Sequence, residues 1–376
     1  MNNKPVKVLY FVDRMLRGGI QSLVIDWVSR FDKEKIKVDF LLLDDGNKYE
    51  LEDVLKEMGC NVYKLDNIWI TNPIDFIKEA KALNTFFKMH HDYKVIHMHS
   101  SSKNYLVLKC AKKYNIPIRI CHSHNIDFQT CNLFKKVYGN YLKTKVKKYA
   151  TDYFACSNVA GEWLFGKDNT KNGKVTIIHN AIDYDKFKYN EKIRYKLRTE
   201  LGFKESDLVV GHVGRFTVQK NHKFLIDIYN ELYKKNNNYR LLLIGTGEKE
   251  NEIKEKVKMY GLEDYVIFAG FKSNVNEYMQ AMDLFIFPSL YEGLGLVLIE
   301  AQASGLPCFT SSEVVPKEAS VSKDLKYVSL NCSANGWSKI ILDCDLRRKD
   351  NKKLVKTAGY YIDDVINELE NFYLRK

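Results

Sequence analysis

Two glutamates and two glycines within one short segment form the group of residues best suited to chemistry. The segment PSLYEGLGLVLIEA runs from Pro288 to Ala301 and follows the apolar run Leu284–Phe287. A strand that turns into a helix here puts Glu292 in the turn and Gly293–Gly295 at the helix start, where free backbone amides attract an anion such as phosphate. Glu300 lies about two turns into the helix among apolar neighbours, so its carboxylate needs polar partners, and ribose hydroxyls would be suitable.

A second group is basic. Gly214 and Arg215 follow the strand-like run Leu208–Val213, and Lys220 comes shortly afterwards, before a helical segment. A guanidinium and an ammonium at the carboxyl end of a strand suit a diphosphate. In isolation, a solvated basic loop is the slightly favoured explanation of the same pattern.

Gly18 and Gly19 form a third group, between the strand-like run Val6–Val12 and the helical run Ile20–Phe31. Glycines in this position let backbone amides approach an anion at a helix N-terminus. The segment contains neither the G-x-G-x-x-G pattern nor a P-loop, so a plain tight turn is the alternative.

Four histidines follow two neighbouring strand-like runs: His97 and His99, then His122 and His124. We expect one of His122 and His124 to hydrogen-bond a ligand or handle a proton, and the others to have packing roles. No carboxylate cluster accompanies them, and the two Asp-x-Asp triplets at 183–185 and 343–345 do not closely follow an apolar strand. We therefore predict no metal site and no metal requirement.

Strand-like runs alternate with helical segments along nearly the whole chain. The predicted strands are Val6–Val12, Val38–Leu43, Val62–Leu65, Val95–Met98, Ile116–His122, Tyr153–Ser157, Val175–Ile178, Leu208–Val213, Arg240–Ile244, Val266–Ala269, Leu284–Phe287 and Cys308–Thr310. This alternation predicts parallel sheets with crossover helices, and so many strands suit two sheets better than one. The predicted fold class is α/β, with two Rossmann-like doubly wound domains that face each other across a cleft.

The domain boundary is expected in the polar stretch 183–198. We assign residues 1–185 to an N-terminal domain and residues 186–359 to a C-terminal domain. With 376 residues, the chain is long enough for two cores.

Composition limits the class of protein. The net charge of +12 favours phosphorylated ligands or an anionic membrane surface over nucleic acid, because no nucleic-acid-binding motif is present. The eight cysteines have no C-x-x-C pair, so neither a zinc site nor a disulfide framework is predicted. No apolar stretch approaches the ~20 residues of a membrane span, and we expect a cytoplasmic protein.

The segment Leu133–Ala150 has apolar and aromatic residues at helical spacing, and six lysines on its other faces. Such a basic amphipathic helix can lie on anionic lipid, which would make the protein peripheral at the inner face of the cell membrane. An ordinary packed helix with solvated lysines is the alternative, and both descriptions can hold together.

Taken in order, these motifs resemble the retaining GT-B-fold glycosyltransferases of family four. The most specific motif is Glu292-x7-Glu300, and the turn Asn180–Asp183 supports it, although Ala181 stands where the family usually has glycine. The segments RGGIQSLVIDW, HSHN at 122–125 and VPKEAS at 315–320 are similar to the branch that builds capsular polysaccharides and exopolysaccharides.

The resemblance implies a role for each motif residue. Glu292 would contact the transferred sugar, one of His122 and His124 would face it, and Glu300 would bind the ribose. The diphosphate of a nucleotide sugar, with UDP as the expected nucleotide, would be held by the remaining set: Gly18, Gly19, Gly214, Arg215, Lys220, Gly293, Leu294 and Gly295. The acceptor would be a lipid-linked saccharide, no separate cofactor would be needed, and a final helix near 360–376 would cross back onto the first domain.

Two other functions fit the same pattern less well. A catalytically silent scaffold of a polysaccharide assembly would not need Glu292, Glu300, Arg215 and Lys220 all intact. A sugar-nucleotide epimerase would turn over the donor without an acceptor, and its sequence signature is not apparent.

Overall fold

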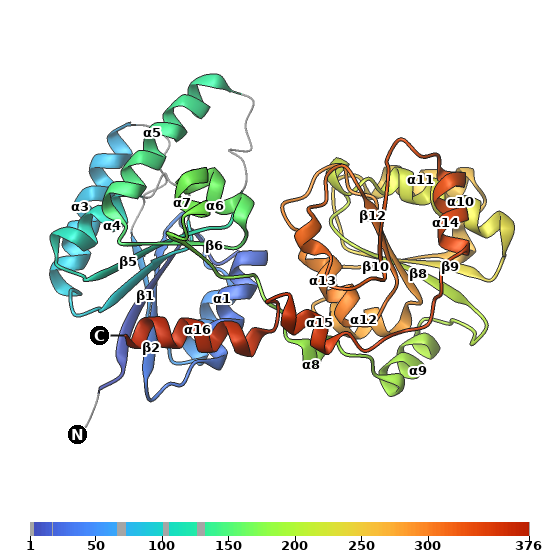
Figure 1. Cartoon of the computed structure of the whole chain (residues 1–376), viewed down its shortest axis with the longest axis horizontal. Helices are drawn as coiled ribbons and strands as arrows, with labels where there is room; N and C mark the ends of the chain where they lie inside the picture. Colours follow the sequence, from blue (N-terminus) through green and yellow to red (C-terminus); the bar gives the residue numbers. More distant parts are fainter. Residues whose placement is uncertain (1–3, 17, 66–72, 101–104, 126–131, 376) are drawn as a thin grey trace. The chain divides into compact units, whose positions relative to one another are not determined.

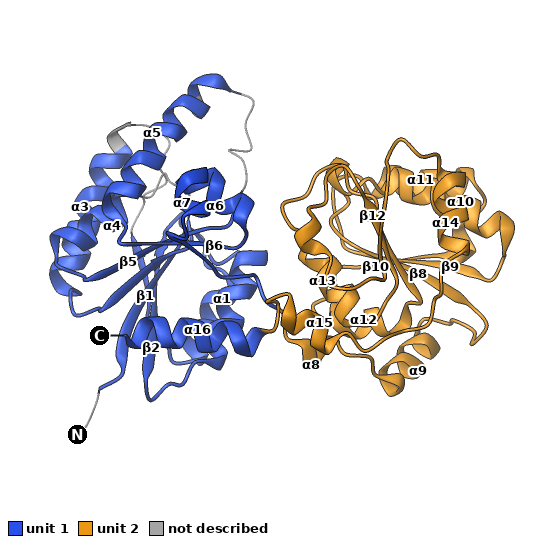
Figure 2. Ribbon diagram, viewed as in Figure 1, with its two compact units in different colours: residues 1–181, 362–376 blue, residues 182–361 orange. Residues whose placement is uncertain are grey.

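The computed structural model describes residues 4–16, 18–65, 73–100, 105–125 and 132–375. The chain divides into two compact units, residues 1–181 with 362–376 and residues 182–361 (Figure 2). Each unit contains one parallel sheet with helices on both faces (Figure 1). The predicted class of two Rossmann-like units is thus confirmed.

Unit 1 contains a seven-stranded sheet in the order β3-β2-β1-β4-β5-β6-β7. Its strands are β1 Val6–Val12, β2 Ile36–Leu43, β3 Val62–Leu65, β4 Val95–Met98, β5 Ile118–Ser123, β6 Asp152–Ala155 and β7 Val175–Ile177. Its helices are α1 Gly19–Arg30, α2 Glu50–Glu57, α3 Pro73–Met89, α4 Tyr105–Lys113, α5 Leu133–Tyr149, α6 Asn158–Phe165, α7 Lys167–Lys171 and α16 Ile362–Leu374. Hydrophobic clusters fill both faces of this sheet.

Unit 2 contains a six-stranded sheet in the order β10-β9-β8-β11-β12-β13. Its strands are β8 Leu208–Val213, β9 Tyr239–Ile244, β10 Val266–Gly270, β11 Leu284–Phe287, β12 Cys308–Ser311 and β13 Leu325–Val328. Its α-helices are α8 Tyr184–Phe187, α9 Glu191–Glu200, α10 His222–Lys235, α11 Glu250–Met259, α12 Val275–Ala281, α13 Leu296–Ala303, α14 Ala334–Leu342 and α15 Lys352–Thr357. Short 3₁₀ turns are η2 Val218–Lys220, η3 Glu263–Tyr265 and η4 Lys317–Ala319.

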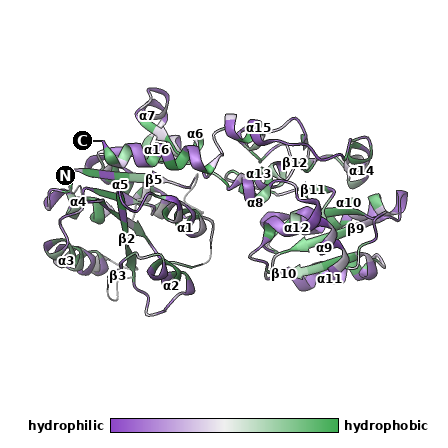
Figure 3. Cartoon of the chain, turned by 90° about the horizontal axis from the view of Figure 1, so that it is seen from below, coloured by the Kyte–Doolittle hydropathy of each residue, from purple (hydrophilic) through white to green (hydrophobic). Residues whose placement is uncertain are grey.

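The strands of both units are largely hydrophobic (Figure 3), as expected for parallel sheets that are covered on both faces. The short edge strand β13, which carries an exposed lysine, is not among the predicted strands. In each unit the first strand along the chain is a central strand of the sheet. The next strands in sequence are added on one side of it, and the later strands are added on the other side. Ligands of such sheets bind beyond the carboxyl ends of the strands, at the point where the strand order reverses.

The polar stretch at 183–198 is part of unit 2 rather than an extended seam. There α9 packs against α12, and two of its arginines bind one aspartate. Arg194 Nη2 lies 2.6 Å from Asp283 Oδ1, and Arg198 Nη1 lies 3.1 Å from Asp283 Oδ2. The arginines that make the sequence look like a linker therefore attach this helix to the unit.

The seven cysteines among the described residues are free thiols, and Cys131 lies outside the described part of the chain. Cys121, Cys156 and Cys308 are buried. Within the described ranges, no helix has both the length and the hydrophobicity to cross a bilayer.

Candidate functional site

The clearest candidate site of unit 2 lies beyond β8 and β11, which are neighbours at the reversal of strand order. Residues 214–221, the β8 loop, follow the first of these strands, and residues 288–295, the β11 loop, follow the second. The sheet thus brings together two motifs that are far apart in the sequence.

Hydrogen bonds join the two loops directly. Leu290 N donates to the carbonyl of Gln219 over 2.8 Å, and Gln219 Nε2 donates to the carbonyl of Tyr291 over 2.9 Å. Asn221 Nδ2 donates to the carbonyl of Pro288 over 3.0 Å. Because these bonds fix the loops to each other, the side chains that they carry have defined separations.

Lys220 and Glu292 form an ion pair between the loops. Lys220 Nζ lies 2.6 Å from Glu292 Oε1, and the side chains are only 18% and 6% exposed. Gln219 Nε2 reaches the same carboxylate oxygen at 3.4 Å, and Lys220 Nζ lies 4.6 Å from the centre of the Phe287 ring. The two predicted site residues are thus each other's ion-pair partner.

Arg215 is exposed at the start of the β8 loop, and among the described residues its side chain has no hydrogen bond or ion pair. Its backbone carbonyl accepts a 2.7 Å hydrogen bond from Thr217 N. The guanidinium is therefore available to an anionic ligand at this edge of the sheet.

The loop after β9, at residues 245–247, contacts and supports the β8 loop. None of the residues predicted for the site lies in this loop. Gly245 has a φ of +137°, and a Cβ atom there would lie 2.1 Å from the carbonyl oxygen of Gly214. Phe216 N donates to the carbonyl of Thr246 over 3.1 Å, and a Cβ on Gly247 would meet Phe216 O at 2.6 Å. The Gly-x-Gly pattern after a predicted strand was the signal for this contact.

The N-terminus of α13 begins at the end of the β11 loop. Gly295 is its N-cap, with a φ of +74°, a left-handed conformation that favours glycine. Gly293 is exposed, and a Cβ there would meet no atom of the described residues within 4 Å. Glu300 is half-buried in the second turn of α13.

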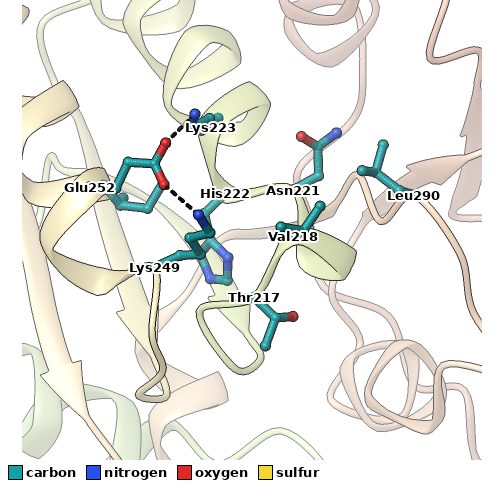
Figure 4. A pocket seen from close by; sticks show the side chains of 9 residues that line it. Thr217, Val218, Asn221, His222, Lys223, Lys249, Glu252 and Leu290 are labelled. Atoms are coloured by element: carbon teal, nitrogen blue, oxygen red, sulfur yellow. Dashed lines mark ion pairs between the residues drawn. The ribbon is translucent and has the colours of Figure 1, made fainter.

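A cavity of about 210 Å³ lies beside the β8 loop (Figure 4). Its lining residues are Thr217, Val218, Asn221, His222, Lys223, Lys249, Glu252, Ile253 and Leu290. Glu252 forms ion pairs with Lys223 and Lys249, so its one carboxylate offsets part of the positive charge of these two lysines. None of the residues that the sequence assigns to the ligand lines this cavity, although Thr217, Val218 and Leu290 lie in the same two loops.

In unit 1, Gly18 and Gly19 occupy the N-terminus of α1, beyond the end of β1, whereas Arg17 lies outside the described residues. Gly18 has a φ of −170°, which any residue adopts. A Cβ on Gly19 would meet no atom within 4 Å. The backbone therefore does not require glycine here, but glycine leaves the start of the helix exposed.

Four histidines of unit 1, which we call the histidine ladder, stack across β4 and β5. His97 Nε2 and His122 Nδ1 are 3.1 Å apart, as are His99 Nδ1 and His124 Nε2. The rings of His97 and His99 are stacked with their centres 4.1 Å apart, and so are those of His122 and His124. Because alternate residues of a strand share one face, the two H-x-H patterns place all four rings together.

The C-terminal helix closes the ladder from the other end of the sequence. Tyr373 of α16 is fully buried, and its hydroxyl lies 2.6 Å from His97 Nδ1 and 2.8 Å from the hydroxyl of Tyr10. Trp27 of α1 stacks on His122 with ring centres 5.9 Å apart. The ladder is therefore enclosed between the sheet and two helices.

Burial keeps these histidines neutral. Desolvation, together with the neighbouring imidazoles, lowers the pKa of His97, His99 and His122 well below the ordinary value of 6.5. Burial lowers the pKa of His124 to about 4. His122 is completely buried whereas His124 is half-buried, so only His124 of this pair has a surface that a ligand can reach.

The ladder also contains the one group of potential metal ligands found among the described residues: His97, His99 and His122, with ligand atoms within 4.8 Å of one another. Both ring nitrogens of His97 already have hydrogen-bond partners, Tyr373 and His122. The rings of His97 and His122 are almost parallel, at 7°, so their nitrogen lone pairs do not converge on one point. This geometry suits a hydrogen-bonded stack better than an ion.

Two family models match the chain, one for each half. The model described as Glycosyltransferase Family 4 matches residues 17–186, and the model described as Glycosyl transferases group 1 matches residues 194–358. The second match contains both loops of the unit 2 site, and the first contains Gly18, Gly19 and the histidine ladder.

Three relatives with similar sequences are bacterial proteins named as glycosyltransferases. A protein named as the glycosyltransferase EpsF of Bacillus subtilis (strain 168) is 29% identical over 99% of this chain and 97% of its own length. The capsular polysaccharide biosynthesis glycosyltransferase CapH of Staphylococcus aureus is 25% identical over 99% of both chains. The UDP-Gal:α-D-GlcNAc-diphosphoundecaprenol α-1,3-galactosyltransferase of Escherichia coli is 24% identical over 82% of this chain and 80% of its own.

A solved structure confirms the fold over nearly the whole chain. Anabaena Alr3699/HepE in complex with UDP superimposes with a TM-score of 0.79 and covers 98% of this chain and 99% of that chain, with 17% sequence identity.

Proposed function

Since the chain belongs to the GT-B glycosyltransferases, with a family 4 and a group 1 domain, we propose that it is a retaining hexosyltransferase of capsular or exopolysaccharide synthesis. The donor is a nucleotide diphosphate sugar, and UDP is the proposed nucleotide because a similar structure binds UDP and a relative is named for UDP-Gal. The acceptor is a saccharide linked to a lipid diphosphate, as in the name of that relative. Such an acceptor brings the enzyme to the cytoplasmic face of the membrane.

The observation that carries this proposal is the contact of Lys220 with Glu292 in the β11 loop, which leads into the N-terminus of α13, while Arg215 is exposed in the same β8 loop as Lys220. As the bond between the sugar carbon and the diphosphate breaks, negative charge grows on the leaving diphosphate. An exposed guanidinium, an ammonium and helix amides stabilise this growing charge more than the charge of the bound donor, and this difference accelerates the reaction. Lys220 is within 2.6 Å of Glu292, so the diphosphate shares or replaces a carboxylate partner when it binds.

The other site residues have complementary roles in this proposal. Glu292 hydrogen-bonds the hydroxyls of the transferred sugar, and Glu300 those of the ribose. His124, rather than the fully buried His122, faces the donor sugar. Since its pKa is lowered to about 4, His124 acts as a neutral hydrogen-bonding group and not as a cation.

We also propose that transfer needs no divalent ion, because Arg215 and Lys220 supply the positive charge that an ion supplies in other transferases. Turnover should then be unchanged after treatment with EDTA. Activity that EDTA abolishes and manganese restores would overturn this part of the proposal while leaving the transferase itself intact.

A thermal-shift screen against UDP, GDP, ADP and their sugars tests the donor assignment. A ligand at about 100 times its Kd adds ~2.7 kcal/mol of stability, which raises Tm clearly. We expect a selective rise with UDP or a UDP sugar that Arg215→Ala and Glu300→Ala abolish and that Lys223→Ala, a cation outside the proposed site, retains. No shift with any nucleotide would favour a scaffold over an enzyme.

A further inference from the structure

The first half of α5 carries a stripe of apolar and aromatic side chains on the outside of unit 1. Their exposed fractions are large: Leu133 72%, Phe134 88%, Val137 63%, Tyr138 49% and Tyr141 53%. Spacings of three and four residues put these side chains on one side of the helix. The first turns of α5 extend past α3 and α4 in Figure 1. All five side chains belong to the large hydrophobic residues that are exposed in the described part of the chain.

This stripe is not the one that holds α5 in the fold. Leu142 and Val146 are 2% and 0% exposed and pack into unit 1, and Lys143 Nζ donates to the carbonyl of Trp163 over 2.7 Å. The helix thus has one apolar face for its own core and a second apolar face that remains outside. Burial of the inner apolar face attaches α5 to unit 1. The exposed apolar face does not contribute to this packing, and an exposed apolar surface of this kind is typical of an interaction site.

Lysines continue the outer face along the helix. At 3.6 residues per turn, Lys145 and Lys148 fall on the same side as the stripe, in the turns that follow Tyr141. Lys145 Nζ lies 4.6 Å from the centre of the Tyr141 ring, and Lys148 is exposed. The helix contains no acidic residue, whereas six of its residues are lysines, with the side chain of Lys135 outside the described part.

We propose that this surface, the α5 face, docks the protein on a bilayer that contains anionic lipid. We define the α5 face as Leu133, Phe134, Val137, Tyr138, Tyr141, Lys145 and Lys148. The apolar side chains enter the boundary between headgroups and acyl chains, and the lysines contact the anionic headgroups. A second copy of this chain is disfavoured as the partner of the α5 face, because two lysine-rich helices on chains of net charge +12 repel each other. The inference goes beyond the proposed function and does not depend on the donor or the acceptor.

Co-sedimentation with vesicles tests the docking. We expect the wild-type chain to sediment with vesicles of mixed phosphatidylcholine and phosphatidylglycerol, weakly with phosphatidylcholine alone, and less as the salt concentration rises. Lys145→Gln and Lys148→Gln should each lower binding about fivefold, which corresponds to about 1 kcal/mol per lysine. The pair Lys192→Gln and Lys196→Gln on α9 is the charge-matched control and should bind like wild type.

The apolar part needs its own variants. Phe134→Ser with Val137→Ser should lower binding at least tenfold, whereas Tyr195→Ser with Met259→Ser, at positions 77% and 81% exposed in unit 2, should not. Since all four side chains are outside the core, Tm and any nucleotide-induced shift should be unchanged in both pairs. Phe134→Trp fluorescence should be quenched by brominated lipid, and Met259→Trp fluorescence should not.

Three results would overturn the proposal: equal binding to neutral and anionic vesicles, wild-type binding by the Phe134/Val137 variant, or no quenching of Phe134→Trp by bound vesicles. A dimer in sedimentation velocity that this variant dissociates, without any vesicle binding, would instead identify the α5 face as a contact between copies.

Discussion

The Lys220 ammonium lies 2.6 Å from the Glu292 carboxylate, although 72 residues separate the two in the sequence. The β8 and β11 loops create this pair, because their strands are neighbours in the sheet. The cation assigned to the diphosphate is thus paired with the carboxylate assigned to the sugar. In the proposed function, donor binding changes the partners of both residues at once.

Removal of Lys220 alone should destabilise unit 2. Lys220→Ala leaves Glu292, whose side chain is 6% exposed, without its ammonium partner, and we expect a loss of about 1–3 kcal/mol in the free energy of unfolding. Lys220→Ala with Glu292→Gln should recover part of that loss, because the remaining group is uncharged. Urea denaturation measures both, and a double variant no more stable than Lys220→Ala would contradict the coupling.

Substitution of either of the two cations should lower turnover strongly. Arg215→Ala and Lys220→Ala should each reduce kcat by about 10²–10³-fold, the usual effect of removing one group that stabilises charge in the transition state. Steady-state transfer assays with a purified acceptor measure this, with Lys223→Ala as the matched control. A folded Arg215→Ala/Lys220→Ala double variant with nearly normal turnover would refute the assignment.

Acid should destabilise the histidine ladder. Below pH 6.5 the unfolded chain binds protons that His97, His99 and His122 do not bind in the folded protein, because their pKa values are lowered there. The free energy of unfolding should therefore fall as the pH decreases, by up to ~1.4 kcal/mol per pH unit for each histidine. Urea denaturation at about pH 7 and about pH 5.5 measures the change.

The buried carboxyl group of Glu79 has the opposite effect on the pH dependence of stability, and a substitution of Glu79 therefore serves as the control. Burial and the charge of Asp13 raise the pKa of Glu79 to about 8, so between about pH 8 and its usual 4.5 the folded protein holds a proton that the unfolded chain has lost. Its contribution to stability then increases as the pH falls. Glu79→Gln should steepen the acid destabilisation, and His99→Asn should reduce it. A wild-type protein that is equally stable at both pH values would contradict the ladder's role.

Gly245 should be the least replaceable glycine of the unit 2 site. In Gly245→Ala, the new Cβ would lie 2.1 Å from the carbonyl oxygen of Gly214, at a φ of +137°. The β8 loop must shift, and we expect a loss of about 3 kcal/mol or more together with loss of nucleotide-induced stabilisation. Gly270→Ala, at a φ of +69° in open space, should lose only ~1 kcal/mol. Similar Tm values for the two variants would contradict this role.

The sequence by itself determines the local elements and the types of residue at the site. Apolar runs of strand length predict Leu208–Val213 and Leu284–Phe287 with the bounds that the structure gives, since buried parallel strands are nearly continuous hydrophobic runs. The glycines and charged residues after these strands are equally visible, because turns and helix N-termini require particular residue types. The edge strand β13 is not among the predicted strands, although it has the same length and the same four residue types as β3, which is predicted.

Only the tertiary structure decides which of these residues meet. The order of strands in a sheet depends on long-range packing, which local periodicity does not encode, and that order pairs Lys220 with Glu292 and places Gly245 against Gly214. The same reason explains why Tyr373, near the end of the chain, hydrogen-bonds a histidine of β4. Which of His122 and His124 is accessible also depends on burial by α1 and α16, so two residues of identical chemistry become distinguishable only in the folded chain.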